Sequence, residues 1–155
     1  MGRLNKYLKA SLSVLLCAAV LVPAASCQTV LTTAGALKAL DEHMTEIGCF
    51  AHYNESEVYL SDVTGDGKND YCVTVTMGSG IVSDMVVVYD GYGKKFYELN
   101  GRKEGCNYVI KNAVNNNLNV TKSLNIFGWE EGDTNEGVPG RAVLENGELV
   151  FIPNH

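Results

Sequence analysis

Two consecutive runs of strand-forming residues, 71–77 and 81–89, place the strongest constraint on the fold of this chain. Apolar side chains occupy every second position of the first run: Tyr71, Val73, Val75 and Met77. That period of two predicts a strand with one apolar face and one face of smaller, hydroxyl-bearing side chains. The second run is almost continuously apolar and rich in valine, which is typical of a central strand covered on both faces.

A helical period precedes these runs. Between Thr33 and Gly48, apolar residues recur at the spacing of one helix stripe: Leu37, Leu40, Met44 and Ile47. Thr33 can cap the start of this helix, and Gly48 can end it. His43 lies beside the stripe, and we expect its side chain to face solvent.

Further strand segments follow, each bounded by turn residues: 96–99, 106–110, 141–144 and 149–152. Asn146-Gly147, between the last two, is a strong signal for a β-hairpin. The segments 115–117 and 130–137 are expected to be loops. The predicted fold class is α+β, with one N-terminal helix packed on an antiparallel β-meander of about six to eight strands.

The first 26 residues have the three-part layout of an export signal. Basic residues come first, an apolar run second and small residues last: Arg3, Lys6 and Lys9, then 10–22, then 24–26. The apolar run is shorter than the roughly 20 residues that a membrane-spanning helix needs. We therefore expect an export signal over 1–26, a linker over 27–32 and a single α+β domain over 33–155.

The end of this signal, Ala24-Ala25-Ser26-Cys27, resembles the lipobox of bacterial lipoproteins. The resemblance implies that Cys27 is lipidated and anchors the protein at a membrane or cell surface. Ala24 departs from the pattern, because a larger aliphatic residue usually stands there. The alternative is ordinary cleavage and secretion, with two disulfides formed in an oxidising compartment. The cysteines available for them are Cys27, Cys49, Cys72 and Cys106.

The charge of the mature chain is strongly negative. All 18 acidic residues follow Ser26, whereas three of the 12 basic residues precede it, so the mature part carries a net charge near −9. Such a surface disfavours nucleic acid and anionic lipid. We therefore expect no nucleic-acid partner, and contact with a membrane only through a lipid on Cys27.

The segment 62–70 concentrates oxygen ligands in a glycine-rich turn. Those ligands fall at alternate positions and at its end: Asp62, Thr64, Asp66, the backbone carbonyl of Lys68, and Asp70. Calcium loops need hard oxygen ligands at such positions, with a glycine at the sixth, where this chain has Gly67. The twelfth position is Val73 and belongs to a strand, so the segment is not an EF-hand. The sequence predicts a calcium site here, and the alternative is an Asp- and Gly-rich turn that holds no metal.

Residues 62–70, followed directly by a strand, resemble the calcium loop of FG-GAP and VCBS repeats, and the similarity extends over about 58–90. The resemblance implies a surface-exposed β unit, as found in adhesins, sugar-binding proteins and secreted enzymes. Thr64 departs from the acidic or amide ligand usual at its position, which weakens the expected binding. A single loop also cannot build a propeller, which needs at least about four blades. The resemblance therefore concerns a local calcium-bound turn.

Signatures of catalysis are sparse. The chain has three histidines, and no serine or cysteine stands in a nucleophile motif. Our first hypothesis is a non-catalytic surface or binding module, in which Tyr92 and Trp129 are candidate contacts for a protein or carbohydrate ligand. The alternatives are an inhibitor or accessory factor of a secreted or envelope enzyme, and a small hydrolase with an unrecognised carboxylate site.

Overall fold

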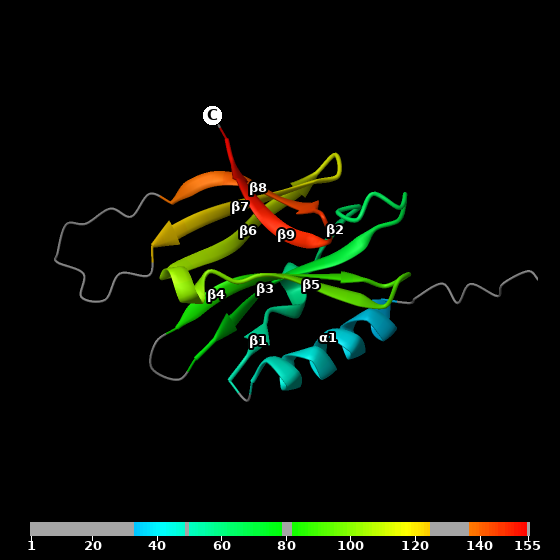
Figure 1. Ribbon diagram of the computed structural model, residues 1–155. Helices are drawn as coiled ribbons and strands as arrows, with labels where there is room; N and C mark the ends of the chain where they lie inside the picture. The colour runs from blue at the N-terminus through cyan, green and yellow to red at the C-terminus, as the bar shows by residue number, and fades with distance from the viewer. Residues whose placement is uncertain (1–32, 49, 79–81, 125–136, 155) are drawn as a thin grey trace, which may run out of the picture.

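The computed structural model describes residues 33–48, 50–78, 82–124 and 137–154, and these form three layers (Figure 1). The first layer is helix α1 (Thr33–Ile47). The second, sheet A, consists of β1 (His52–Tyr53), β2 (Tyr59–Ser61), β3 (Asp70–Met77), β4 (Ser83–Asp90) and β5 (Lys95–Leu99). The third, sheet B, consists of β6 (Cys106–Val114), β7 (Asn117–Leu124), β8 (Val138–Glu145) and β9 (Glu148–Pro153). The predicted helix therefore lies at its expected place, on a fold that is mostly β.

All strand pairs are antiparallel. Sheet A has the order β1-β3-β4-β5, and β2 pairs with a second part of β3. Sheet B is a simple meander in the order β6-β7-β8-β9. Its last hairpin turns at Asn146-Gly147, where both residues have positive φ angles of 53° and 83°, as the Asn-Gly signal predicts.

Sheet A lies between two apolar cores. One face packs on α1, from which Ala36, Leu40 and Met44 are buried at helical spacing. The other face packs on sheet B. Strand β4 contributes to both cores, with Val87 toward the helix and Val88 toward sheet B, which confirms the prediction of a central strand covered on both faces.

The hydroxyl-bearing face of β3 is turned toward sheet B. There the Ile110 N–H donates a hydrogen bond to Thr74 Oγ1 at 3.0 Å. The Asp84 N–H donates to Asn107 Oδ1 at 3.0 Å, and Thr76 Oγ1 donates to Asp84 Oδ1 at 2.7 Å. These bonds explain why threonines can lie on this partly buried face, because each hydroxyl has a hydrogen-bond partner there.

The strand count and the sheet organisation differ from the prediction. The described residues contain nine strands in two sheets, where we expected one meander of about six to eight. Strands β1 and β2 have only two and three residues, which is too short for an alternation of apolar and polar residues to show in the sequence. The meander also breaks after β5, where a 3-10 turn over Arg102–Glu104 ends at Gly105 with φ 66° and redirects the chain into sheet B.

Cys72 and Cys106 are both buried in the core between the sheets, and both are free thiols. Burial raises the pKa of the Cys72 thiol, and the neighbouring Asp70 adds to that effect. Cys27 and Cys49 lie outside the described residues, as do the predicted export signal and linker. Within the described ranges, no helix has the length and apolar character needed to cross a membrane.

Candidate functional site

The predicted calcium segment forms the connection between β2 and β3 at one end of sheet A (Figure 1). Ser61 pairs with Asp70 across the two strands, so the chain leaves and re-enters the sheet at neighbouring positions. Gly65 and Gly67 have φ angles of 76° and 82°, which other residues rarely adopt. The glycines therefore permit a compact turn that brings the loop's N–H groups close to its own carboxylates.

Each of the three aspartates accepts hydrogen bonds from the loop backbone. Asp62 accepts from the Gly65 N–H at 2.8 Å and from the Gly67 N–H at 3.0 Å. Asp66 accepts from the Lys68 N–H at 2.8 Å. The same carboxylates that the sequence assigns to a cation thus also hold the turn together.

Asp70 is the most buried of the three, with 1% of its surface exposed. Its Oδ2 accepts from the Val63 and Thr64 N–H groups at 2.9 Å each, and the Thr64 hydroxyl donates to Oδ1 at 3.4 Å. Burial raises the pKa of Asp70 from its ordinary value. The three donors oppose that rise, whereas the negative charge of Asp90 adds to it.

The carboxylate oxygens of this loop are hydrogen-bonded to the protein but are not saturated as acceptors. Among the described residues, no group of three or more His, Cys, Asp or Glu side chains is arranged to hold a metal ion. Asp62 and Asp70 already use both carboxylate oxygens as acceptors, although each oxygen keeps a second lone pair. Calcium binding at Asp62, Thr64, Asp66, the Lys68 carbonyl and Asp70 therefore stays a prediction.

The loop meets the β4–β5 turn through a cation–π contact. The Lys68 ammonium lies 2.9 Å from the ring centroid of Tyr92, whose residue is 52% exposed. Asp90 shapes this turn by accepting from the N–H groups of Tyr92 and Gly93 at 2.9 and 2.7 Å. The sequence pattern assigns only the backbone carbonyl of Lys68 to the site and gives no signal for a role of its side chain. Trp129 lies outside the described residues.

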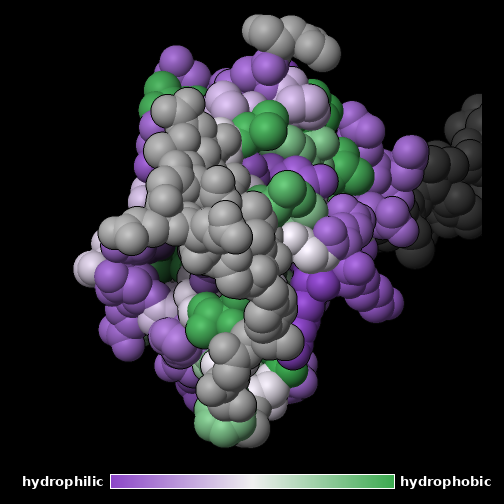
Figure 2. Space-filling model, turned by 90° about the vertical axis from the view of Figure 1, so that its left-hand side faces the viewer, coloured by the Kyte–Doolittle hydropathy of each residue, from purple (hydrophilic) through white to green (hydrophobic). Residues whose placement is uncertain are grey.

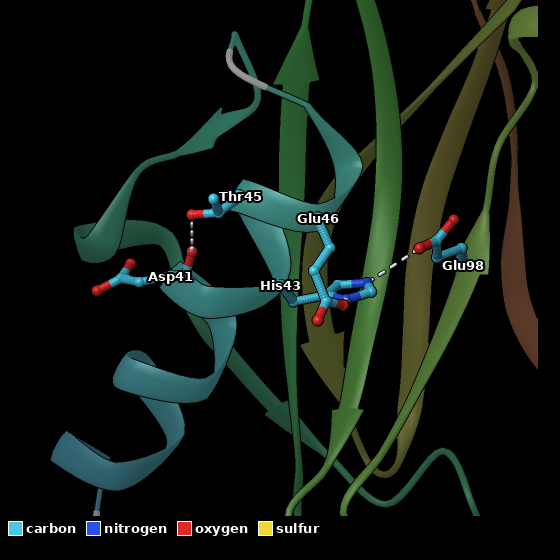
Figure 3. A network of polar contacts seen from close by, with 5 residues as sticks. All are labelled: Asp41, His43, Thr45, Glu46 and Glu98. Atoms are coloured by element: carbon cyan, nitrogen blue, oxygen red, sulfur yellow. Dashed lines mark hydrogen bonds and ion pairs between the residues drawn. The ribbon is translucent and has the colours of Figure 1, made fainter.

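The prediction that His43 faces solvent was wrong. Only 12% of its side chain is exposed, and its ring stacks on Phe96 with centroids 3.9 Å apart. Nε2 lies 2.9 Å from a carboxylate oxygen of Glu98, and Nδ1 lies 3.3 Å from one of Glu46 (Figure 3). The face of α1 that packs on sheet A is wide enough to include His43, which lies over strand β5. Packing on Phe96 and contacts with two carboxylates fix the position of its ring.

These residues border an open cleft of about 340 Å³. Its lining comes from α1, β3, β5 and the segment that follows β5: His43, Glu46, Ile47, Met77, Glu98, Asn100 and Arg102. Sequence reasoning missed this cleft because its walls are up to 59 positions apart and no motif joins them. Close beside the same helix, a second open cleft of about 400 Å³ contains His52 and Glu55, and there Tyr53 donates to Asp41 at 3.0 Å.

Exposed apolar side chains do not form one large visible patch. Figure 2 shows separate apolar areas within a mostly hydrophilic surface at one end of the molecule. Val82, Leu124 and Val138 are about half exposed, but each stands next to a segment that the structure does not describe. Their exposure therefore does not define a binding surface.

Comparison with known proteins gives no relative for this chain. No protein-family model matches it, and neither does any curated protein or solved structure.

Proposed function

We propose that this protein is an exported, non-catalytic binding module that recognises a protein or carbohydrate ligand at one end of sheet A. The proposal rests chiefly on one observation, the contact of Lys68 with the half-exposed ring of Tyr92. This contact joins the loop over 62–69 to the β4–β5 turn and so presents an aromatic ring beside charged groups. Aromatic side chains held in this way provide contact area at a small entropy cost, which suits recognition.

In this proposal calcium binds the loop and makes it more rigid. Asp62, Asp66 and Asp70 would hold the ion together with Thr64 and the Lys68 carbonyl, and the ion would supply only positive charge. Extracellular calcium modules have dissociation constants near 10⁻⁴–10⁻³ M, so saturation is expected to add about 1–3 kcal/mol of stability. That gain would fix the position of Lys68 and, through it, of Tyr92.

Thermal melts test the calcium part. The protein is melted with calcium, with magnesium and with chelator, and we expect only calcium to raise the midpoint. Asp66→Ala is the informative variant, because Asp66 makes one backbone bond and its loss costs little without metal. Glu148→Ala is the matched control, since Glu148 is exposed and lies outside the loop. Equal midpoints in all three conditions would leave the metal-free turn as the correct interpretation.

Binding assays test the recognition part separately. Immobilised wild-type protein and Tyr92→Ala are exposed to a panel of polysaccharides and to envelope extract. Phe50→Ala is the control, because Phe50 is an aromatic residue of similar exposure, 58%, on a different loop. We expect Tyr92→Ala to lose binding and Phe50→Ala to bind like the wild type. A stable complex with an envelope enzyme that survives Tyr92→Ala would favour the inhibitor or accessory-factor alternative.

A further inference from the structure

One wall of the cleft beside His43 carries two carboxylates, Glu46 and Glu98, whose side chains are 78% and 38% exposed to solvent. Glu46 and Glu98 each direct one carboxylate oxygen to the imidazole of His43. Among the described residues, their other oxygens have no protein donor within hydrogen-bond distance. The ring itself is occupied, since both nitrogens face carboxylates and Phe96 covers one ring face. The His43 ring thus lies between the Glu46 and Glu98 side chains (Figure 3).

An exposed guanidinium, that of Arg102, stands on another wall. Arg102 has no carboxylate within ion-pair distance in the described part of the chain, and its Nη1 makes only a weak contact of 3.7 Å with the sulfur of Met77. The Arg102 backbone N–H is bound by Asn100 Oδ1 at 3.0 Å, which leaves the Asn100 amide group as a further donor. A guanidinium with free donors binds a carboxylate in a bidentate manner.

The two walls share one space of about 340 Å³, at the lower end of the size range of small-molecule sites. Ile47 and Met77 add apolar surface between the charged groups. Glu46 and Glu98 share the single imidazole of His43, so at least one of their two negative charges is not matched by it, and within the described residues Arg102 is paired with neither glutamate. The complementary ligand has an ammonium group, a carboxylate and a small apolar part.

We propose that this cleft binds a zwitterionic amino compound, of the class of α-amino acids and short peptides. The carboxylate of the ligand lies on Arg102 and Asn100, its ammonium on Glu98 and Glu46, and its apolar side chain against Ile47 and Met77. The inference is independent of calcium and of Tyr92, because none of its residues belongs to the loop over 62–69 or to the β4–β5 turn.

The test is a titration of the full, ¹⁵N-labelled protein, followed by NMR. The probes are L-leucine, the dipeptide Leu-Leu, N-acetyl-leucine and leucinamide, each up to roughly 10 mM, where a ligand with a Kd near 1 mM is mostly bound. Leucine and Leu-Leu distinguish a free amino acid from a peptide. The other two lack the ammonium and the carboxylate respectively. We expect saturable shifts near Arg102 and Glu98 with a zwitterion, and at least about tenfold weaker binding of each truncated probe.

Two variants locate the carboxylate contact. Arg102→Gln should weaken zwitterion binding about tenfold or more while leaving the weak affinity for leucinamide unchanged. Arg141→Gln is the control, because Arg141 is exposed on sheet B, outside the cleft, where its Nη1 donates to Asn117. Shifts that lie elsewhere, an absence of shifts with both zwitterions, or equal binding by Arg102→Gln and wild type would each overturn the proposal.

Discussion

Replacement of Asp70 tests whether its hydrogen bonds hold the turn between β2 and β3. Asp70→Ala removes the acceptor of the Val63 and Thr64 N–H groups, which lie at 2.9 Å, and the weaker partner of the Thr64 hydroxyl. A fully buried donor left without a partner costs about 1–3 kcal/mol; these two are partly buried, and removal of a buried charge offsets part of the cost. We expect a net loss of about 2–3 kcal/mol in the free energy of unfolding.

The matched variant is Asp70→Asn. Asparagine keeps an oxygen for the two backbone N–H groups and turns its amide toward the Thr64 hydroxyl, which can accept as well as donate. It also removes the cost of burying a charge in a residue that is 1% exposed. We therefore expect Asp70→Asn to be at least as stable as wild type at neutral pH.

The assay is urea denaturation followed by far-ultraviolet circular dichroism, with chelator present so that no cation contributes. A loss of about 2–3 kcal/mol corresponds to a fall of roughly 10 °C in Tm, so thermal melts provide an independent measure. The reasoning is refuted if Asp70→Ala matches wild type, because the acceptor would then be dispensable. It is equally refuted if Asp70→Asn loses as much stability as Asp70→Ala, because charge rather than hydrogen bonding would then matter.

Three further predictions follow from the same structure. Burial raises the pKa of Asp70 above 3.8, so the folded state binds more protons than the unfolded state between 3.8 and that raised value. The ionised carboxylate therefore lowers the stability of the wild type at neutral pH. Asp70→Asn lacks this cost, so its urea midpoint should exceed that of the wild type most at about pH 7, and the difference should shrink toward about pH 4. His43→Ala should lower the free energy of unfolding by about 1–2 kcal/mol, because it removes the stacking on Phe96 and two carboxylate contacts; an unchanged urea midpoint would contradict this. Gly140→Ala should cost about 1–3 kcal/mol in the same assay, because its new methyl group would overlap the backbone carbonyl oxygen of Ile152, and wild-type stability would show that β8 and β9 move apart easily.

Local patterns predicted the helix and several of the strands. The helix, β3, β4 and the last hairpin each carry a period or a turn signal over several consecutive residues. Strand β7 was not predicted, because it begins at Asn117, directly after two asparagines with φ angles of 50° and 59° that belong to a turn. The division into two sheets depends on where the chain passes from one layer to the other. The sequence pattern of a single strand does not indicate that position.

The candidate sites show a different limit of the sequence. Carboxylates at the spacing of Asp62, Asp66 and Asp70 can bind a cation or accept backbone N–H groups, and both tasks use the same oxygens. Spacing therefore cannot separate a metal-bound loop from one that holds itself together. The cleft at His43 was missed for another reason, since it exists only where α1 crosses β5 and the chain beyond it.

Strands β3 and β4 belong to both apolar cores, and this sharing has a consequence for how the molecule loses its structure. Neither core keeps its full set of side chains once this central pair separates, so the helix and sheet B lose their support together. A small opening at the edge, at β1 or β2, leaves the pair intact and should be frequent. Amide hydrogens should therefore exchange slowly in β3 and β4 and quickly in β1 and β2. The loop over 62–69 lies between these two regions.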